Sequence, residues 1–396
     1  GLLSHIKKRL PYGMDDQWMV FSHYTERGWT VDNLWHIFTD FYGGQYAPLA
    51  FLSYLVLYAG FGYDPFYFHM FSLLLHIGCV CLVWKLISSL LRVHGGVSEK
   101  QILYVNFITT LLFAVHPINV EAVAWISALK VLLYAFFYLL GLLCYLRYIR
   151  TSKIFYYVLT IGCFLCSFWG KEQAVTFPLA LLIVDWFTNR NMKNLEVWSE
   201  KMSFLIMAFF FGIITVLSQG KGPYEMIFPL YQRLLFGCFA LVEYITKSLL
   251  PVNLNFFYPF PIVLGEEPPL HYYLYPVVLL FLMGWIIAYR NNRYLVFGVL
   301  LFLVNLLFSI HLFNMSRHAI VADRYMYLSY VGIAFLIANG IWWLRKRLSY
   351  FKAALVFLFF YCFFLSVYTF HYTKKWENTT MVKKYTKEVL EKVEWK

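Results

Sequence analysis

Long apolar stretches with few charged residues divide most of the chain and constrain its fold more than any other feature. A helix needs about 20 apolar residues to cross the roughly 30 Å hydrocarbon core of a bilayer. By this rule we expect ten spans, near residues 65–91, 101–116, 128–149, 154–169, 173–188, 202–218, 272–289, 294–312, 325–344 and 351–371. Charged residues make up 14% of the chain, against about 25% in soluble domains. The sequence therefore predicts an all-α, polytopic transmembrane helix bundle and excludes disordered and collagenous classes.

Basic residues concentrate in the short connections between the expected spans, near 85–100, 147–153, 190–201, 290–293 and 345–352. Such connections face the cytoplasm in membrane proteins. The longer loops 1–64, 116–130, 170–173, 219–271 and 313–324 then face the opposite side. We attribute the formal net charge of +12 to this topology and expect no nucleic-acid partner.

The alternation of loops makes two further predictions. Residues 231–250 are apolar, but the loops on both sides of them are expected outside, so this segment is predicted to be re-entrant or interfacial. The chain also starts outside, which predicts one more transmembrane helix before it and about eleven in total. Three regions follow: a first extracytoplasmic loop at 1–64 with interfacial helices, a helix bundle at 65–371, and an extracytoplasmic tail at 372–396 that resembles the start of another domain.

Ionisable residues near membrane spans are costly to keep and point to function. Here they gather in the loops expected outside: Asp15 and Asp16; His116, Glu121 and Lys130; Lys171 and Glu172; Arg317, His318, Asp323 and Arg324. Each group alone also has a structural explanation, as a turn, a helix end or an ion pair. Together they supply carboxylates that can act as a general base and cations that can hold a phosphate. This set suits transfer of a sugar from a lipid phosphate, with Asp15 activating the acceptor hydroxyl.

Other motifs point to no metal or redox site. Cys163 and Cys166 form a CxxC inside an apolar run, which we interpret as small packing residues rather than redox or metal chemistry. His69 and His76 lie two helical turns apart on one face, where they pack or line a cavity. The sequence contains no P-loop and no GxGxxG, GxSxG or HExxH motif. Adjacent carboxylates leave room for a divalent ion, but no metal ligands are assigned.

Several motifs resemble a known family. They are the aspartate pair Asp15–Asp16, YAPLAFLSY at 46–54, GYDPFYFHMFSLLLH at 62–76, FAVHPINVEAVAWISALKVLL at 113–133, GKEQAVTFP at 170–178 and ADRYMYL at 322–328. In this order they resemble the GT-C superfamily of membrane glycosyltransferases. The likeness is to the protein O-mannosyltransferase-like branch with transmembrane and tetratricopeptide-repeat regions. The HP…EAVAWIS segment is the most specific of these motifs.

The resemblance implies a GT-C-like fold and an inverting single displacement. The donor would be a polyprenyl or dolichyl phosphate sugar, commonly mannose, and the acceptor a Ser or Thr of an extracytoplasmic protein. Asp15 would be the catalytic base, with Asp16 beside it. The donor-binding residues would be His116, Glu121, Lys130, Lys171, Glu172, Asp323 and Arg324, to which the charge pattern adds Arg317. The chain departs from the family by lacking the first helix and ending before any tetratricopeptide repeat.

Other functions remain open from the sequence. The acceptor of the same donor could be a lipid or cell-wall glycan, and the chain could transport lipid-linked intermediates or act as a membrane scaffold. Charges at one face argue against transport, because transporter sites lie near the bilayer midplane between matched halves. We expect an integral protein of a bacterial inner membrane, or of the ER membrane in a eukaryote. Its expected partners are membrane lipid, a lipid-linked sugar, a protein acceptor and other members of a membrane assembly.

Overall fold

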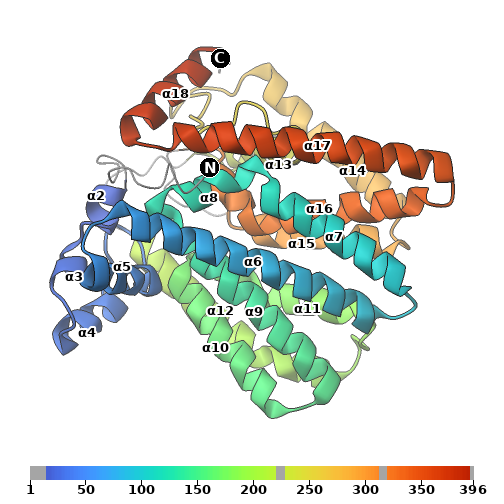
Figure 1. Cartoon of the computed structure of the whole chain (residues 1–396), viewed down its shortest axis with the longest axis horizontal. Helices are drawn as coiled ribbons and strands as arrows, with labels where there is room; N and C mark the ends of the chain where they lie inside the picture. Colours follow the sequence, from blue (N-terminus) through green and yellow to red (C-terminus); the bar gives the residue numbers. More distant parts are fainter. Residues whose placement is uncertain (1–14, 220–227, 312–318, 393–396) are drawn as a thin grey trace.

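The computed structural model describes residues 15–219, 228–311 and 319–392. Within these ranges the chain is helical, with two isolated bridges, Tyr42 to Gln45 and Tyr258 to Val321, and no strand. The all-α prediction is therefore confirmed for the described residues. Figure 1 shows the helices as a bundle whose long members run from one end of the molecule to the other.

Six helices are long and apolar enough to cross a membrane. They are α6 (Pro65–His94), α9 (Leu129–Thr151, entered through η2, Ile126–Ala128), α12 (Leu195–Gln219), α14 (Leu274–Ala288, entered through η4, Leu270–Tyr273), α16 (Met326–Leu344, entered through η5, Asp323–Tyr325) and α17 (Leu348–Lys375). A seventh is formed if α7 (Glu99–Val115) is joined to η1 (Pro117–Asn119) and α8 (Val120–Ala124), which bend by 51° at their break. The bend lies at His116, whose extended backbone precedes Pro117.

Three of the expected spans form shorter helices. They are α10 (Ile154–Gly170), α11 (Phe177–Phe187, after η3, Glu172–Thr176) and α15 (Arg293–Leu306). By length alone these helices do not reach the roughly 20 residues that a bilayer requires. The count of ten spans and the GT-C-like fold thus remain predictions. Two further helices are α13 (Leu230–Leu249) and α18 (Thr379–Lys392). α13 is not among the candidate spans and carries three charged residues. The re-entrant or interfacial position of 231–250 stays a prediction.

Short helices precede the first span. They are α2 (Asp16–Met19), α3 (His23–Glu26), α4 (Val31–Thr39) and α5 (Pro48–Phe61). The Thr30 side chain caps α4 by accepting from the Asn33 backbone N–H at 3.1 Å. Pro48 stands in the first turn of α5, where its missing N–H costs nothing. Trp35 is 68% exposed on α4, which suits the interfacial position expected from the sequence.

The core lies where the helices cross at close range. α9 packs between α6 and α10, and α16 packs against α7 and α15. The α15–α16 contact depends on two glycines, because a Cβ at Gly332 would lie 2.5 Å from the Gly298 carbonyl oxygen. Buried aromatic residues, including Tyr134, Tyr138 and Phe164, fill the space around α9.

The two ends of the bundle differ in chemistry. Asp16 is hydrogen-bonded to Ser127 at the start of α9, whereas Arg147 and Arg150 lie near the end of that helix. In Figure 1, α2, α8 and the end of α17 lie toward the left, and the α6–α7 and α16–α17 connections lie at the right. The acidic pair and the basic connections are therefore at opposite ends, as the charge pattern predicts.

Candidate active site

The two adjacent aspartates have different environments. Asp16 is fully buried, and its Oδ1 accepts hydrogen bonds from the Ser127 backbone N–H at 2.9 Å and from the Ser127 hydroxyl. Burial raises the pKa of Asp16 to about 6, against the lowering effect of these hydrogen bonds. Asp15 is half-buried. Of the two, Asp15 is thus the one that a substrate can reach, and Asp16 fastens the loop to α9.

Glu121 and Arg324 form an ion pair between α8 and η5. One guanidinium nitrogen lies 2.5 Å from Glu121 Oε1, and the Arg324 backbone N–H donates to Oε2 at 2.8 Å. Glu121 is fully buried, whereas the Arg324 side chain is 20% exposed. The guanidinium also lies 5.3 Å from the Trp125 ring centroid and 5.2 Å from that of Tyr325. Since a guanidinium has five donors, Arg324 keeps some for a ligand.

Two lysines lie near this pair. Lys130 is buried and donates to Gln45 Oε1 at 2.5 Å. Its ammonium group interacts electrostatically with Lys171, Glu172, Asp15 and Arg324. Lys171 is buried, with its Nζ 4.6 Å from the Tyr325 ring centroid. Cations packed on aromatic faces are held in place while keeping their charge.

Asp323 has no exposed surface. Its two carboxylate oxygens accept from the Tyr258 hydroxyl at 2.9 and 3.0 Å. The same hydroxyl oxygen receives a hydrogen bond from Lys247 Nζ at 3.1 Å and another from the Asn255 backbone N–H at 2.7 Å. The Asp323 carboxylate is therefore already hydrogen-bonded within the protein. For it to contact a donor directly, its hydrogen bonds to Tyr258 would have to break.

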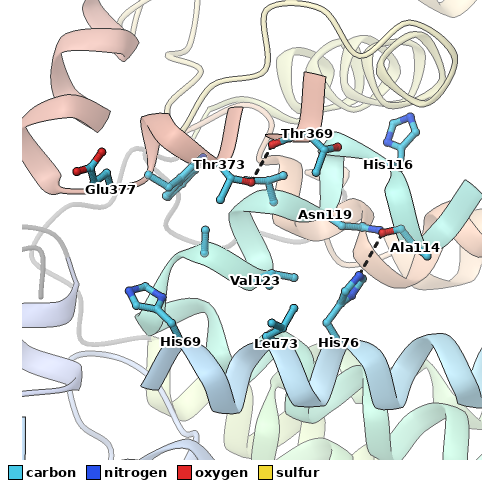
Figure 2. A pocket seen from close by; sticks show the side chains of 13 residues that line it. His69, Leu73, His76, Ala114, His116, Asn119, Val123, Thr369, Thr373 and Glu377 are labelled. Atoms are coloured by element: carbon cyan, nitrogen blue, oxygen red, sulfur yellow. Dashed lines mark hydrogen bonds between the residues drawn. The ribbon is translucent and has the colours of Figure 1, made fainter. Parts of the chain in front are cut away.

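A cavity of about 170 Å³ lies on the other face of α8. Figure 2 shows His69 and His76 rising from α6 on one side of it, with Thr369 and Thr373 of α17 on the other. This confirms the sequence-based alternative in which the two histidines line a cavity. His116 also lines it, with Nε2 buried and no hydrogen bond to a described residue. Glu121 is not part of this lining, since it faces Arg324.

The structure thus brings together most of the residues expected from the sequence. Asp15, Glu121, Lys130, Lys171, Glu172 and Arg324 form one charged cluster, which we call the outer cluster. His116 belongs to the separate cavity. Arg317 and His318 lie outside the described residues. Within the described ranges, no group of three or more His, Cys, Asp or Glu residues could hold a metal ion.

Sequence reasoning missed several residues that support the outer cluster, namely Gln45, Trp125, Ser127, Lys247 and Tyr258. Trp125 and Ser127 belong to the AVAWIS motif, and their closeness to Glu121 in the sequence could have identified them as parts of the site. Gln45 and Tyr258 come from distant loops, and nothing in their local sequence marks them.

A second group of charges lies between α9, α11 and α12. Arg190 contacts Glu200 through two nitrogens at 2.6 and 2.9 Å, and Lys201 Nζ lies 2.5 Å from Asp185 and 3.0 Å from Glu200. Asp185 and Lys201 have no exposed surface. Two cations and two carboxylates balance each other, which is typical of a structural network.

Comparison with known proteins adds a partial likeness. The chain is 32% identical over 189 residues to protein O-mannosyl-transferase TMTC2 of Mus musculus, covering 43% of this chain and 21% of that protein. It is 28% identical over 172 residues to protein O-mannosyl-transferase Tmtc3 of Drosophila melanogaster (39% and 18%) and 31% identical over 167 residues to protein O-mannosyl-transferase TMTC4 of Homo sapiens (37% and 22%).

The match therefore spans about a fifth of the length of these curated relatives. No protein-family profile matches the chain, and no solved structure matches it. Together, the apolar helices and the similarity indicate a membrane protein related to proteins that are named protein O-mannosyl-transferases.

Proposed function

We propose that this chain carries the active site of a membrane glycosyltransferase of the GT-C type. It transfers a sugar, most simply mannose, from a polyprenyl or dolichyl phosphate to a Ser or Thr hydroxyl of an extracytoplasmic protein. The names of the partial relatives support the sugar and the protein acceptor. The observation that carries the proposal is the outer cluster, in which the half-buried Asp15 interacts with Lys130 and Arg324 at one end of the bundle.

The reaction would be a single displacement. Asp15 accepts the proton of the acceptor hydroxyl as its oxygen bonds to the anomeric carbon on the face opposite the phosphate. The bond between that carbon and the phosphate oxygen breaks, and its electron pair leaves with the polyprenyl phosphate. The products are the glycosylated hydroxyl with inverted configuration and a lipid phosphate.

The leaving phosphate gains negative charge in the transition state, so cations nearby accelerate its departure. Lys130, Lys171 and Arg324 supply three such cations within the outer cluster. Gln45, Tyr325 and Glu121 hold them at fixed positions, so little reorganisation is needed when the donor binds. Glu172 is half-buried beside Lys130 and would contact the sugar hydroxyls. The displacement as written needs no metal ion.

The assignment of the base to Asp15 rests on the contrast with Asp16. Asp16 already accepts two hydrogen bonds from Ser127 and has no exposed surface. Asp15 interacts electrostatically with Lys130 and Arg324, near the expected position of the donor phosphate. The site would face the ER lumen in a eukaryote or the periplasm in a bacterium.

The test is transfer of radiolabelled mannose from polyprenyl-phosphate mannose to a mixture of secreted proteins, using purified wild type, Asp15→Asn and Asp16→Asn. We expect Asp15→Asn to lower the rate at least a hundredfold, while Asp16→Asn, which keeps an oxygen for Ser127, retains most of it. An extract of membrane glycans as alternative acceptor distinguishes a glycan product from a protein product. If wild type neither binds the donor nor transfers from it, the proposed function is wrong.

A further inference from the structure

The segment that precedes Arg324 is hydrogen-bonded to α13 and to the loop that follows α13. Ile320 N–H donates to the Tyr258 carbonyl at 2.9 Å, and Ala322 N–H donates to the Tyr244 hydroxyl of α13 at 3.2 Å. α13 also packs closely against Ile310, whose carbonyl oxygen a Cβ at Gly237 would overlap. Ile320 and Ala322, which precede Asp323 and Arg324, are therefore held by Tyr258 and by Tyr244 of α13, two residues that are remote from them in sequence.

One side-chain relay completes this attachment. Lys247 of α13 donates to the Tyr258 hydroxyl, and that hydroxyl donates to the Asp323 carboxylate. Lys247 Nζ also lies 4.4 Å from the Tyr258 ring centroid. All three residues are at most 5% exposed. The Tyr258 hydroxyl accepts from the Lys247 ammonium while it donates to Asp323, so the cation polarises the hydroxyl and strengthens its bond to Asp323.

We propose that Lys247 and Tyr258 are positioning residues for the donor, which fix Asp323 and through it orient the neighbouring Arg324 toward the donor phosphate. This inference rests on the proposed function and deepens it. It assigns Asp323 to support rather than to contact with the sugar. It also explains why α13 carries the buried Lys247, because a helix that only lies at a membrane surface does not need a buried lysine.

The orientation of Arg324 needs such support because Glu121 alone does not define it. Glu121 binds one guanidinium nitrogen and the Arg324 backbone N–H, so the position of the guanidinium also depends on where the Arg324 backbone lies. The Asp323 backbone precedes Arg324 directly, so a shift of Asp323 moves the guanidinium. Since a displacement of about 1 Å is enough to cost a large factor in rate, an anchored Asp323 has a measurable effect.

The test compares Tyr258→Phe and Lys247→Met with wild type in the mannose-transfer assay. Tyr258→Phe removes one oxygen and keeps the ring, so the core stays filled. We expect the KM for polyprenyl-phosphate mannose to rise about tenfold in both variants, while the KM for the acceptor stays unchanged. Lys247→Arg, which keeps the charge and a donor, should bring the donor KM back to within about threefold of wild type.

The matched control is Tyr138→Phe, which removes another buried tyrosine hydroxyl, one with only a 3.4 Å contact to Thr176. A purely structural role would lower the yield or the melting temperature without changing the KM of the folded protein. Adding Tyr258→Phe to Arg324→Met should give no further rise in donor KM, since the relay acts through Arg324.

The outcomes separate the two proposals. Unchanged donor KM in folded Tyr258→Phe and Lys247→Met, with an active wild type, overturns the positioning role alone. A further rise when Tyr258→Phe is added to Arg324→Met also overturns it. If Tyr258→Phe does not fold, Lys247→Met gives the same reading. A wild type that neither binds nor uses the donor overturns both.

Discussion

Asp16 and Ser127 are 111 residues apart in sequence, and two hydrogen bonds from Ser127 converge on one oxygen of Asp16. This contact ties the first loop to the start of α9. It brings the neighbouring Asp15 within electrostatic range of Lys130, which lies three residues after Ser127 in the first turn of α9. A short polar contact between distant segments thus sets the position of the proposed base.

The first prediction concerns the pH dependence of stability. Burial raises the pKa of Asp16 from 3.8 to about 6, so the folded state favours the protonated form. This stabilisation is present below pH 4 and is lost as the pH rises through 6, by at most about 3 kcal/mol. Asp16→Asn removes this pH dependence. The free energy of unfolding of the variant minus that of wild type should therefore increase from pH 4 to pH 7.

The measurement is thermal unfolding of both proteins in one detergent across that pH range. The control is Gly162→Ala, which changes no titratable group and whose added Cβ would have nothing within 4 Å. Its difference from wild type should be the same at every pH. A constant difference for Asp16→Asn as well would contradict the prediction.

The second prediction concerns the buried partner of Arg324. Arg324→Met leaves the Glu121 carboxylate without its cation, which should cost about 3–5 kcal/mol. Glu121→Gln in the same background should recover part of this loss, because a neutral amide tolerates burial better. Chemical unfolding gives both values. The comparison is Arg92→Met, which breaks an exposed pair with Glu99 and should cost less than about 1 kcal/mol. Equal losses for the two pairs would refute the argument.

The third prediction separates stability from activity. Lys201 has no exposed surface and contacts both Asp185 and Glu200, so Lys201→Met should lower the free energy of unfolding by about 3 kcal/mol or more. The network lies near the Arg150 end of α9, away from the outer cluster, and the donor KM of the folded protein should remain that of wild type. A raised donor KM would show that the two ends are coupled.

The fourth prediction compares two glycines on α10. A Cβ at Gly170 would lie 2.7 Å from the Tyr134 backbone nitrogen, whereas a Cβ at Gly162 has nothing within 4 Å. Gly170→Ala must therefore push α10 away from α9, with an expected cost of about 1–3 kcal/mol. Gly162→Ala should be neutral or stabilise by up to about 1 kcal/mol. The measurement is the melting temperature of each variant, which should fall for Gly170→Ala and should not fall for Gly162→Ala.

The sequence predicts the helical class and several spans because apolar length and charge are local properties. The expected span 65–91 matches α6 closely, and the expected span 101–116 ends within one residue of the end of α7 at Val115. It does not predict where helices stop inside an apolar run. The expected span 294–312 stops being helical at Leu306, where α15 ends. α10, by contrast, ends at Gly170, within one residue of the expected end at 169.

The candidate site shows the same division. Charged residues in apolar surroundings were found from sequence because their burial is costly wherever they lie. Lys247 lies in a segment predicted to be re-entrant or interfacial, so the sequence does not single it out as a site residue. Tyr258 looked like one of many loop aromatics. Their role depends on the contact between α13 and the segment 320–323, which only the fold creates.

α14 has no buried residue, and its chief contacts are with α13 and η4. Its window of highest hydropathy is only 6% buried within the protein, against 78% for α9. Lipid rather than protein must then supply nearly all of its stabilising environment. Hydrogen exchange along α14 should accordingly depend on bilayer thickness and composition, while exchange along α9 should depend on side-chain packing. The two helices belong to one bundle, yet the first owes its stability to insertion and the second to assembly.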